Sequence, residues 1–181
     1  MWDFVGWFIA NIGNWLLLFL SIATILTPMI IYLLERSRTP KLKFKGFLKL
    51  DNPEGINTKT QGDGTGYFIE IINSNKRSEG NADLCRGFIT LGNRTHTTLW
   101  EYGHAGNTFA RKALLFLFYV EKNDKTIEFV NWQQSRQNIE SKPYDERIHD
   151  SITIGIECSR GHCPKPLTEN IQNIINSATD V

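Results

Sequence analysis

The sequence lacks a strong net charge, because 20 Lys and Arg residues nearly balance 19 Asp and Glu residues in a chain of 181. Domains that bind nucleic acid through its phosphates usually carry a clear basic excess. The balance therefore argues against a nucleic-acid partner. The length suits one domain with an appendage.

The first 34 residues lack Lys and Arg, and their one charged side chain is Asp3. A cleaved signal peptide begins with a basic region and ends in small residues, whereas this segment runs into Glu-Arg-Ser-Arg. Residues 15–34 carry no charge, and a helix of that length spans about 30 Å, the thickness of a bilayer core. Buried helices of soluble domains are rarely apolar on every face for so long. We therefore predict a transmembrane helix at residues 15–34.

Residues 1–14 are rich in aromatic side chains, among them Trp2 and Trp7. Tryptophan is enriched at membrane interfaces, because its ring is apolar while its N–H group needs a polar partner. Two interpretations stay open. Residues 1–14 form a short interfacial helix whose tryptophans contact lipid headgroups, or they begin a longer, tilted span.

Basic residues gather on the other side of the predicted span, in a juxtamembrane segment at residues 35–40 and just beyond it. Charges this close to a span set its orientation. The positive-inside rule thus predicts a single-pass protein of the cell membrane, with the N-terminus outside and the C-terminal domain in the cytoplasm. The basic side chains expected to contact lipid headgroups are Arg36, Arg38, Lys41, Lys43 and Lys45.

From residue 41 the apolar period changes to two, as expected for half-buried strands. Leu42, Phe44, Leu48 and Leu50 share one face of the first strand, and its lysines share the other. Lysines there have a second interpretation, as charges that protect an edge strand from aggregation. Seven candidate strands follow from this kind of pattern: residues 41–50, 67–73, 82–92, 96–102, 113–121, 126–132 and 151–158.

The strand pattern predicts a mainly β protein, with an antiparallel immunoglobulin-like β-sandwich at residues 41–164. Residues 113–121 are apolar throughout but too short to span a bilayer, so we expect a central strand buried on both faces. Residues 133–150 are polar and aperiodic, and are expected to form an exposed loop. Residues 165–181 are expected to form a short amphipathic helix and tail, with Thr168 as the helix N-cap.

Recognisable catalytic motifs are also lacking in this sequence. No Ser or Cys sits in a nucleophile elbow, and His96, His104 and His149 show no paired spacing, so we expect solvated surface histidines and no enzyme activity. We expect no cofactor, with zinc as the alternative. Three residues, Cys158, His162 and Cys163, are weak candidate zinc ligands, with Cys85 or another histidine as the fourth.

The cysteines have two further interpretations. A Cys158–Cys163 disulfide requires an oxidising compartment, which contradicts the predicted cytoplasmic location. The simplest interpretation is that Cys85 and Cys158 are small core residues and that Gly161 makes a turn.

Several stretches together resemble a broad set of uncharacterised prokaryotic single-span membrane proteins that carry a small immunoglobulin-like domain. These stretches are YLLERSRTPKLKF at the end of the span, then YFIEIIN, NADLCRGFITL, TTLWE and ALLFLFYVE. The resemblance covers residues 32–132 and implies a fold and a membrane location. It implies no activity, and the CSRGHC stretch lies outside it.

Two functions from different classes are therefore carried forward. The first is a membrane-anchored binding or scaffold module without catalysis, such as an accessory subunit of a membrane complex, with the lipid bilayer and a membrane protein as its partners. The second is a metal- or redox-active domain that uses Cys158, His162 and Cys163.

Overall fold

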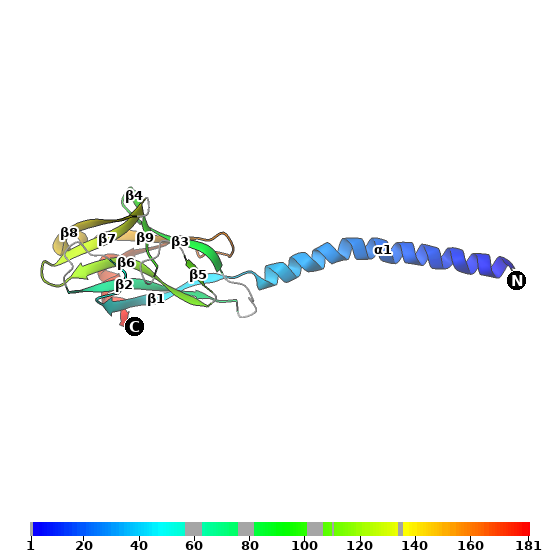
Figure 1. The fold of residues 1–181 in the computed structure, drawn as a ribbon, viewed down its shortest axis with the longest axis horizontal. Helices are drawn as coiled ribbons and strands as arrows, with labels where there is room; N and C mark the ends of the chain where they lie inside the picture. Colours follow the sequence, from blue (N-terminus) through cyan, green and yellow to red (C-terminus); the bar gives the residue numbers. More distant parts are fainter. Residues whose placement is uncertain (1, 57–62, 76–81, 101–106, 110, 134–135) are drawn as a thin grey trace. The chain divides into compact units, whose positions relative to one another are not determined.

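The computed structural model describes residues 2–56, 63–75, 82–100, 107–109, 111–133 and 136–181. The chain forms two separate compact units, Met1–Arg38 and Thr39–Val181. The first is a helix and the second is a mainly β domain (Figure 1).

Helix α1 runs without interruption from Trp2 to Arg38 and passes through Pro28. It is long and apolar enough, by length and composition, to span a membrane. Among the described residues, positions 2–14 and 15–34 therefore belong to one continuous helix. Arg36 and Arg38 lie in its last turn, and the helix ends before Pro40, whose ring disfavours helical backbone in the residue before it.

The β domain consists of two sheets. The strand order is β11-β1-β2-β6-β7-β8 in the larger sheet and β10-β9-β3-β4 in the smaller one, where β5 also pairs with β3. The pairs within each sheet are antiparallel, except that β11 runs parallel to β1. The strands are β1 (Leu42–Asp51), β2 (Gly64–Asn73), β3 (Ala82–Leu91), β4 (Arg94–Thr98), β5 (Asn107–Phe109), β6 (Lys112–Glu121), β7 (Thr126–Gln133), β8 (Arg136–Pro143), β9 (Ser151–Glu157), β10 (Leu167–Asn170) and β11 (Thr179–Asp180).

Strand β6 lies inside the larger sheet and is buried on both faces, as the sequence predicts. Leu115 and Leu117 face the main core between the sheets, whereas Phe116 belongs to a second apolar cluster with Phe68 and Leu99. The sheets also meet through backbone just after β4. The N–H of Phe116 donates to the carbonyl of Leu99 at 2.8 Å, and Trp100 bridges to Leu115.

The predicted faces of β1 are partly wrong. A register irregularity between Phe44 and Gly46 interrupts the alternation where β1 pairs with β2. As a result Phe47 packs against the main core, Leu48 packs against the second cluster and Leu50 is exposed. A bulge of this kind shifts every later side chain to the opposite face.

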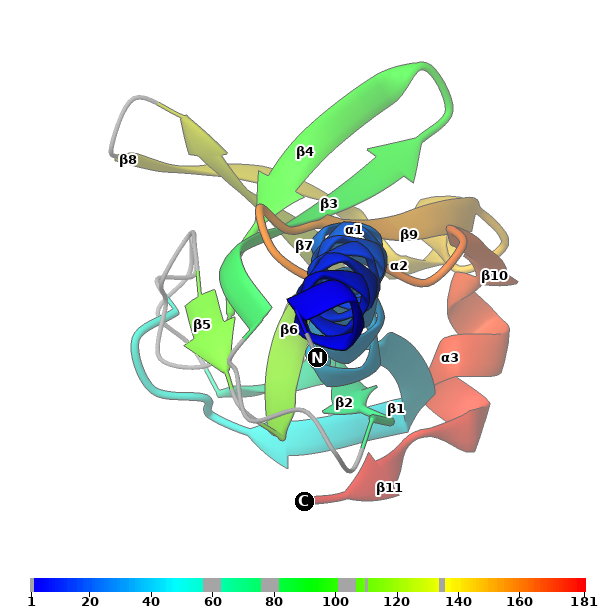
Figure 2. The ribbon, with the colours of Figure 1, turned by 90° about the vertical axis from the view of Figure 1, so that its right-hand side faces the viewer.

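The predicted short C-terminal helix is confirmed, but the residues on either side of it form strands instead of a tail. Residues 167–170 form β10 beside β9, helix α3 covers Ile171–Ser177, and β11 pairs with β1. Thr168 lies in the strand, and the N-cap is Asn170, whose side chain accepts a bond from the N–H of Gln172. Helix α3 thereby connects the two sheets along one side of the domain, so the C-terminal segment is part of the β domain (Figure 2).

The expected loop at residues 133–150 is also wrong. This region contains strand β8 and a single-turn helix α2, Tyr144–Arg147, which begins directly after Pro143. Strand β8 pairs with β7 over its whole length and forms one edge of the larger sheet. Apart from Ile139 and Pro143 its side chains are polar, so neither face of the strand is apolar and apolar periodicity gave no signal.

A disulfide joins Cys85 to Cys158, and Cys163 is a free thiol. The cysteines lie at adjacent ends of β3 and β9, and the indole N–H of Trp100 donates to the carbonyl of Cys85 at 3.0 Å. The Cys158–Cys163 disulfide, one of the alternatives for these cysteines, is therefore not formed, and Cys85 and Cys158 are bonded to each other where the simplest interpretation left them unpaired. The expectation that Cys85 is a core residue is confirmed, since its side chain is fully buried.

Two glycines of the smaller sheet provide a test of how tightly the domain is packed. A Cβ atom on Gly87 would overlap the fully buried side chain of Leu115, and one on Gly155 would overlap the ring of Phe88, which is half exposed. We expect Gly87→Ala to lower the free energy of unfolding by about 1–3 kcal/mol, because Leu115 has no space to move into.

Gly155→Ala is the matched control, and its effect is expected to stay within about 1 kcal/mol, because Phe88 can turn toward solvent. Urea unfolding of the full chain in detergent, followed by tryptophan fluorescence, measures both. Equal effects of the two substitutions would contradict the difference in packing.

Candidate functional site

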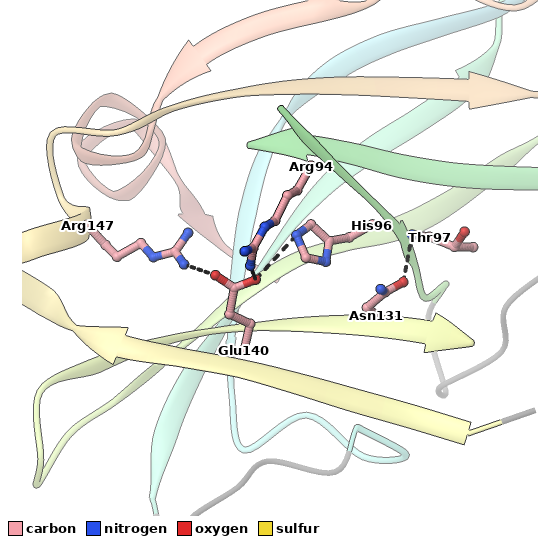
Figure 3. Close-up of polar contacts among 6 residues, drawn as sticks. All are labelled: Arg94, His96, Thr97, Asn131, Glu140 and Arg147. Atoms are coloured by element: carbon pink, nitrogen blue, oxygen red, sulfur yellow. Dashed lines mark hydrogen bonds and ion pairs between the residues drawn. The ribbon is translucent and has the colours of Figure 1, made fainter. Parts of the chain in front are cut away.

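The candidate site is a polar cluster around Glu140 on the edge strand β8 (Figure 3). Glu140 stands directly opposite Phe129 of β7, so its side chain shares the face of the sheet that looks toward the core. Its carboxylate is 27% exposed and receives three side chains from two other elements. These are Arg147 from α2, and His96 and Arg94 from β4.

Arg147 is the most deeply buried charged group of the cluster, with a side chain only 2% exposed. Its Nη2 donates to Glu140 Oε1, and its guanidinium carbon lies 5.1 Å from the centre of the Phe129 ring. The Nε and Nη1 groups are buried, and neither has a hydrogen-bond partner among the described residues. The aromatic contact and the single ion pair therefore hold the guanidinium in place, but two sets of N–H donors are left unused.

His96 faces the same carboxylate from the opposite side, with its Nε2 3.5 Å from Glu140 Oε2. Its ring also stacks against Phe129, at 6.5 Å between centroids. Burial lowers the pKa of His96, and the nearby positive charges of Arg147 and Arg94 lower it further, although Glu140 acts in the opposite direction. The imidazole is therefore neutral at pH 7, and Glu140 is balanced mainly by the arginines.

A pocket of about 640 Å³ opens beside this cluster. It lies where the turn between β3 and β4 approaches β8, α2 and the start of β9. Its charged lining consists of Arg94, Lys142, Arg147, Glu140 and Asp150, and the remaining lining residues are Leu91, Gly92, Asn93 and Ser151. The volume falls in the range of pockets that bind small molecules.

Nearby polar bonds fix the strand that carries His96. The side-chain oxygen of Asn131 on β7 accepts a hydrogen bond from the N–H of Thr97 at 3.1 Å (Figure 3). The hydroxyl of Thr98 donates to the carbonyl of Phe116 at 2.6 Å and is fully buried. Both bonds join β4 to the larger sheet, so the histidine and the carboxylate are held by backbone elements and not by loops.

The predicted headgroup-contacting residues belong to α1 and to the start of the β domain. Arg36 and Arg38 end α1, and Trp7 is 63% exposed on it, while the side chain of Trp2 lies outside the described set. Lys41 and Lys43 are exposed at the start of the β domain. Lys45 is paired with Glu70 of β2 at 2.8 Å, a surface ion pair that contributes little to stability.

The predicted metal ligands Cys158, His162 and Cys163 do not form a common site in the structure. Cys158 is bonded to Cys85, so it has no thiolate to offer, and His162 is exposed. Cys163 is partly buried, and burial raises the pKa of its thiol. Among the described residues, no three His, Cys, Asp or Glu side chains are grouped so that they could hold a metal ion.

The site could not be recognised from the sequence, where His96 was expected on the surface and Glu140 and Arg147 in a loop. His96 is 6% exposed. The available signal was the run Lys-Pro-Tyr-Asp-Glu-Arg, in which a proline precedes acidic residues and then a basic one, the usual order in a short helix. Reading it would have located α2, although not the partner of Arg147.

Comparison of the chain with protein-family models, with curated proteins and with solved structures found no match.

The burial of Arg147 makes the Glu140 carboxylate important for stability. We expect Glu140→Gln to lower the free energy of unfolding by about 2–4 kcal/mol, because it leaves a buried guanidinium without a counter-charge. Glu146→Gln, in α2 and exposed, is the control with the same chemical change and should stay within about 0.5 kcal/mol. Urea midpoints of the two variants at pH 7.5 measure the difference, and a Glu140→Gln variant as stable as the control would contradict it.

The lowered pKa of His96 predicts a loss of stability on acidification. The unfolded chain takes up a proton near pH 6.5, whereas the folded protein does so at a lower pH. The contribution of His96 is thus complete above about pH 6.5 and is lost as the pH falls through the pKa of the folded state. Urea midpoints measured from pH 8 to pH 5 should fall in the wild type.

The control for this pH dependence is a pair of variants. His96→Gln should flatten the change between pH 7 and pH 5, whereas His162→Gln, at an exposed histidine, should keep it. A pH dependence that survives in His96→Gln would show that another group causes it.

Proposed function

We propose that this protein is a membrane-anchored, non-catalytic binding domain that serves a membrane complex as a scaffold or accessory subunit. The observation that carries the proposal is the pocket beside Glu140, whose charged groups are fixed by α2, β4 and β8. The apolar helix at the other end of the chain supports the anchoring part. Fixed charges in a rigid pocket suit recognition, because binding then requires little reordering.

An immunoglobulin-like sandwich belongs to the same proposal. Two packed β-sheets support it, and so does a buried tryptophan, Trp100, beside a disulfide. One feature differs from that pattern. The Cys85–Cys158 disulfide joins neighbouring strands of one sheet, whereas the immunoglobulin disulfide joins the two sheets.

The basic residues after the helix support a cytoplasmic β domain, by the positive-inside rule. The disulfide favours a second candidate, a surface domain that faces an oxidising compartment. In the first case a reducing cytoplasm would open the Cys85–Cys158 bond that the structure contains, and in the second case the bond would persist. Membrane side and thiol content therefore report on the same alternative.

The test uses the full chain in its host membrane, with a fluorescent protein or alkaline phosphatase fused after Val181. In the proposed orientation both reporters stay in the cytoplasm. We therefore expect fluorescence and no phosphatase activity, because alkaline phosphatase becomes active only in an oxidising compartment. We also expect all three cysteines to react with a thiol reagent after denaturation without reductant. Phosphatase activity, with Cys163 alone reactive, would establish the surface domain instead.

The binding role is tested on the same preparation by extraction into a mild detergent and native mass spectrometry. A stoichiometric complex with a membrane protein or a small molecule is expected. A chain that is always a lone monomer, in membranes that contain its normal partners, would overturn the proposal.

A further inference from the structure

We propose that the pocket beside Glu140 binds an oxyanion group, a carboxylate or a phosphate, of a small organic molecule. Arg147 is the inner anchor of this anion, and Arg94 and Lys142 contact it at the entrance. The inference rests on the proposed binding function and specifies the chemistry of its ligand.

The first argument is the unused hydrogen-bonding capacity of Arg147. A guanidinium has five N–H donors in a planar fork, a shape that matches carboxylate and phosphate oxygens. Glu140 takes up Nη2, while Nε and Nη1 are buried without a hydrogen-bond partner in the described chain. Burying charged donors without partners is costly, so a group that supplies acceptor oxygens there gains more than it would at the surface.

The second argument is the charge of the lining. Arg94, Lys142 and Arg147 contribute three positive charges, and Glu140 and Asp150 contribute two negative ones. His96 adds none at neutral pH, since burial lowers its pKa. The pocket therefore carries one excess positive charge, which a single anionic group neutralises.

The third argument is the placement of the cations. Arg147 is held rigidly by Phe129 and Glu140, whereas Arg94 is 78% exposed and Lys142 is exposed on β8. Arg94 approaches the carboxylate at 3.9 Å, beyond a direct hydrogen bond, and so keeps its donors available for another anion. An inner fixed cation with two outer mobile ones is an arrangement that attracts an anion and then orients it.

The size of the pocket selects the class of ligand. A bare ion would leave most of 640 Å³ unfilled, whereas an organic acid or a phosphate ester fills such a space. The pocket already contains one such contact, because the Glu140 carboxylate is bound by Nη2 of Arg147.

The experiment titrates the purified full chain in detergent with sodium phosphate and, separately, with sodium succinate. Ionic strength is held constant with sodium chloride, and both calorimetry and the shift in melting temperature are recorded. Saturable binding of either salt above the chloride baseline is expected. Phosphate alone would identify a phosphate ligand, and succinate alone a carboxylate ligand.

The variants are chosen so that the core stays intact. Arg94→Gln and Lys142→Gln remove exposed charges at the pocket. Each should raise the dissociation constant of the anion about tenfold, the size of one lost charge-assisted hydrogen bond. Lys112→Gln removes the same charge from an exposed position on β6 and should leave it unchanged.

Two results would overturn the inference. One is the absence of saturable binding by both salts in the wild type, and the other is an equal loss in Lys112→Gln, which would indicate unspecific charge attraction. If the wild type retains a membrane partner in mild detergent but binds neither salt, the inference fails while the proposed binding function stands.

Discussion

The backbone contact between the residues after β4 and strand β6 determines how the two sheets are joined. The Leu99 carbonyl accepts from Phe116, and Trp100 bridges to Leu115, so β4 leaves one sheet and ends against the other. The hydroxyl of Thr98 and the side chain of Asn131 reinforce this corner. Because β4 is fixed in this way, His96 and Arg94 face β8 across the gap between the sheets. Without this contact between the sheets, His96 and Arg94 would not be held opposite Glu140.

The same arrangement explains how an edge strand carries a buried ion pair. Within the described part of the chain, strand β8 pairs on one side, with β7, and lies at the edge of the sheet. Edge strands tend to pair with other chains unless charges or covering elements prevent it. Here Glu140 points inward, and α2 folds back over the strand to supply Arg147. Such a pair contributes little net stability, since both charges lose water. Folding stability alone therefore does not account for this pair.

Apolar patterns predicted much of the fold, because the strands that form the core alternate or are continuously apolar. Residues 113–121 and the alternating Ile152, Ile154 and Ile156 were placed correctly for this reason. Polar segments that are held by tertiary contacts were not. Strand β8 has no apolar face, and β10 is a short strand recognised only by its pairing with β9. The candidate site consists mostly of such segments, so its residues could not be grouped from the sequence.

The pairing of β1 with a strand on each side has a mechanical consequence. This strand is the next element after α1, so a force applied to the helix enters the β domain here. Strand β1 is hydrogen-bonded to β2 on one side and to β11 on the other. Where the strand begins, the backbone N–H of His162 donates to the carbonyl of Pro40, and the carbonyl of His162 accepts from the N–H of Leu42. The last strand of the chain therefore helps to hold the first one. A force on α1 is therefore distributed over β1, β2 and β11 before β1 can separate from the sheet.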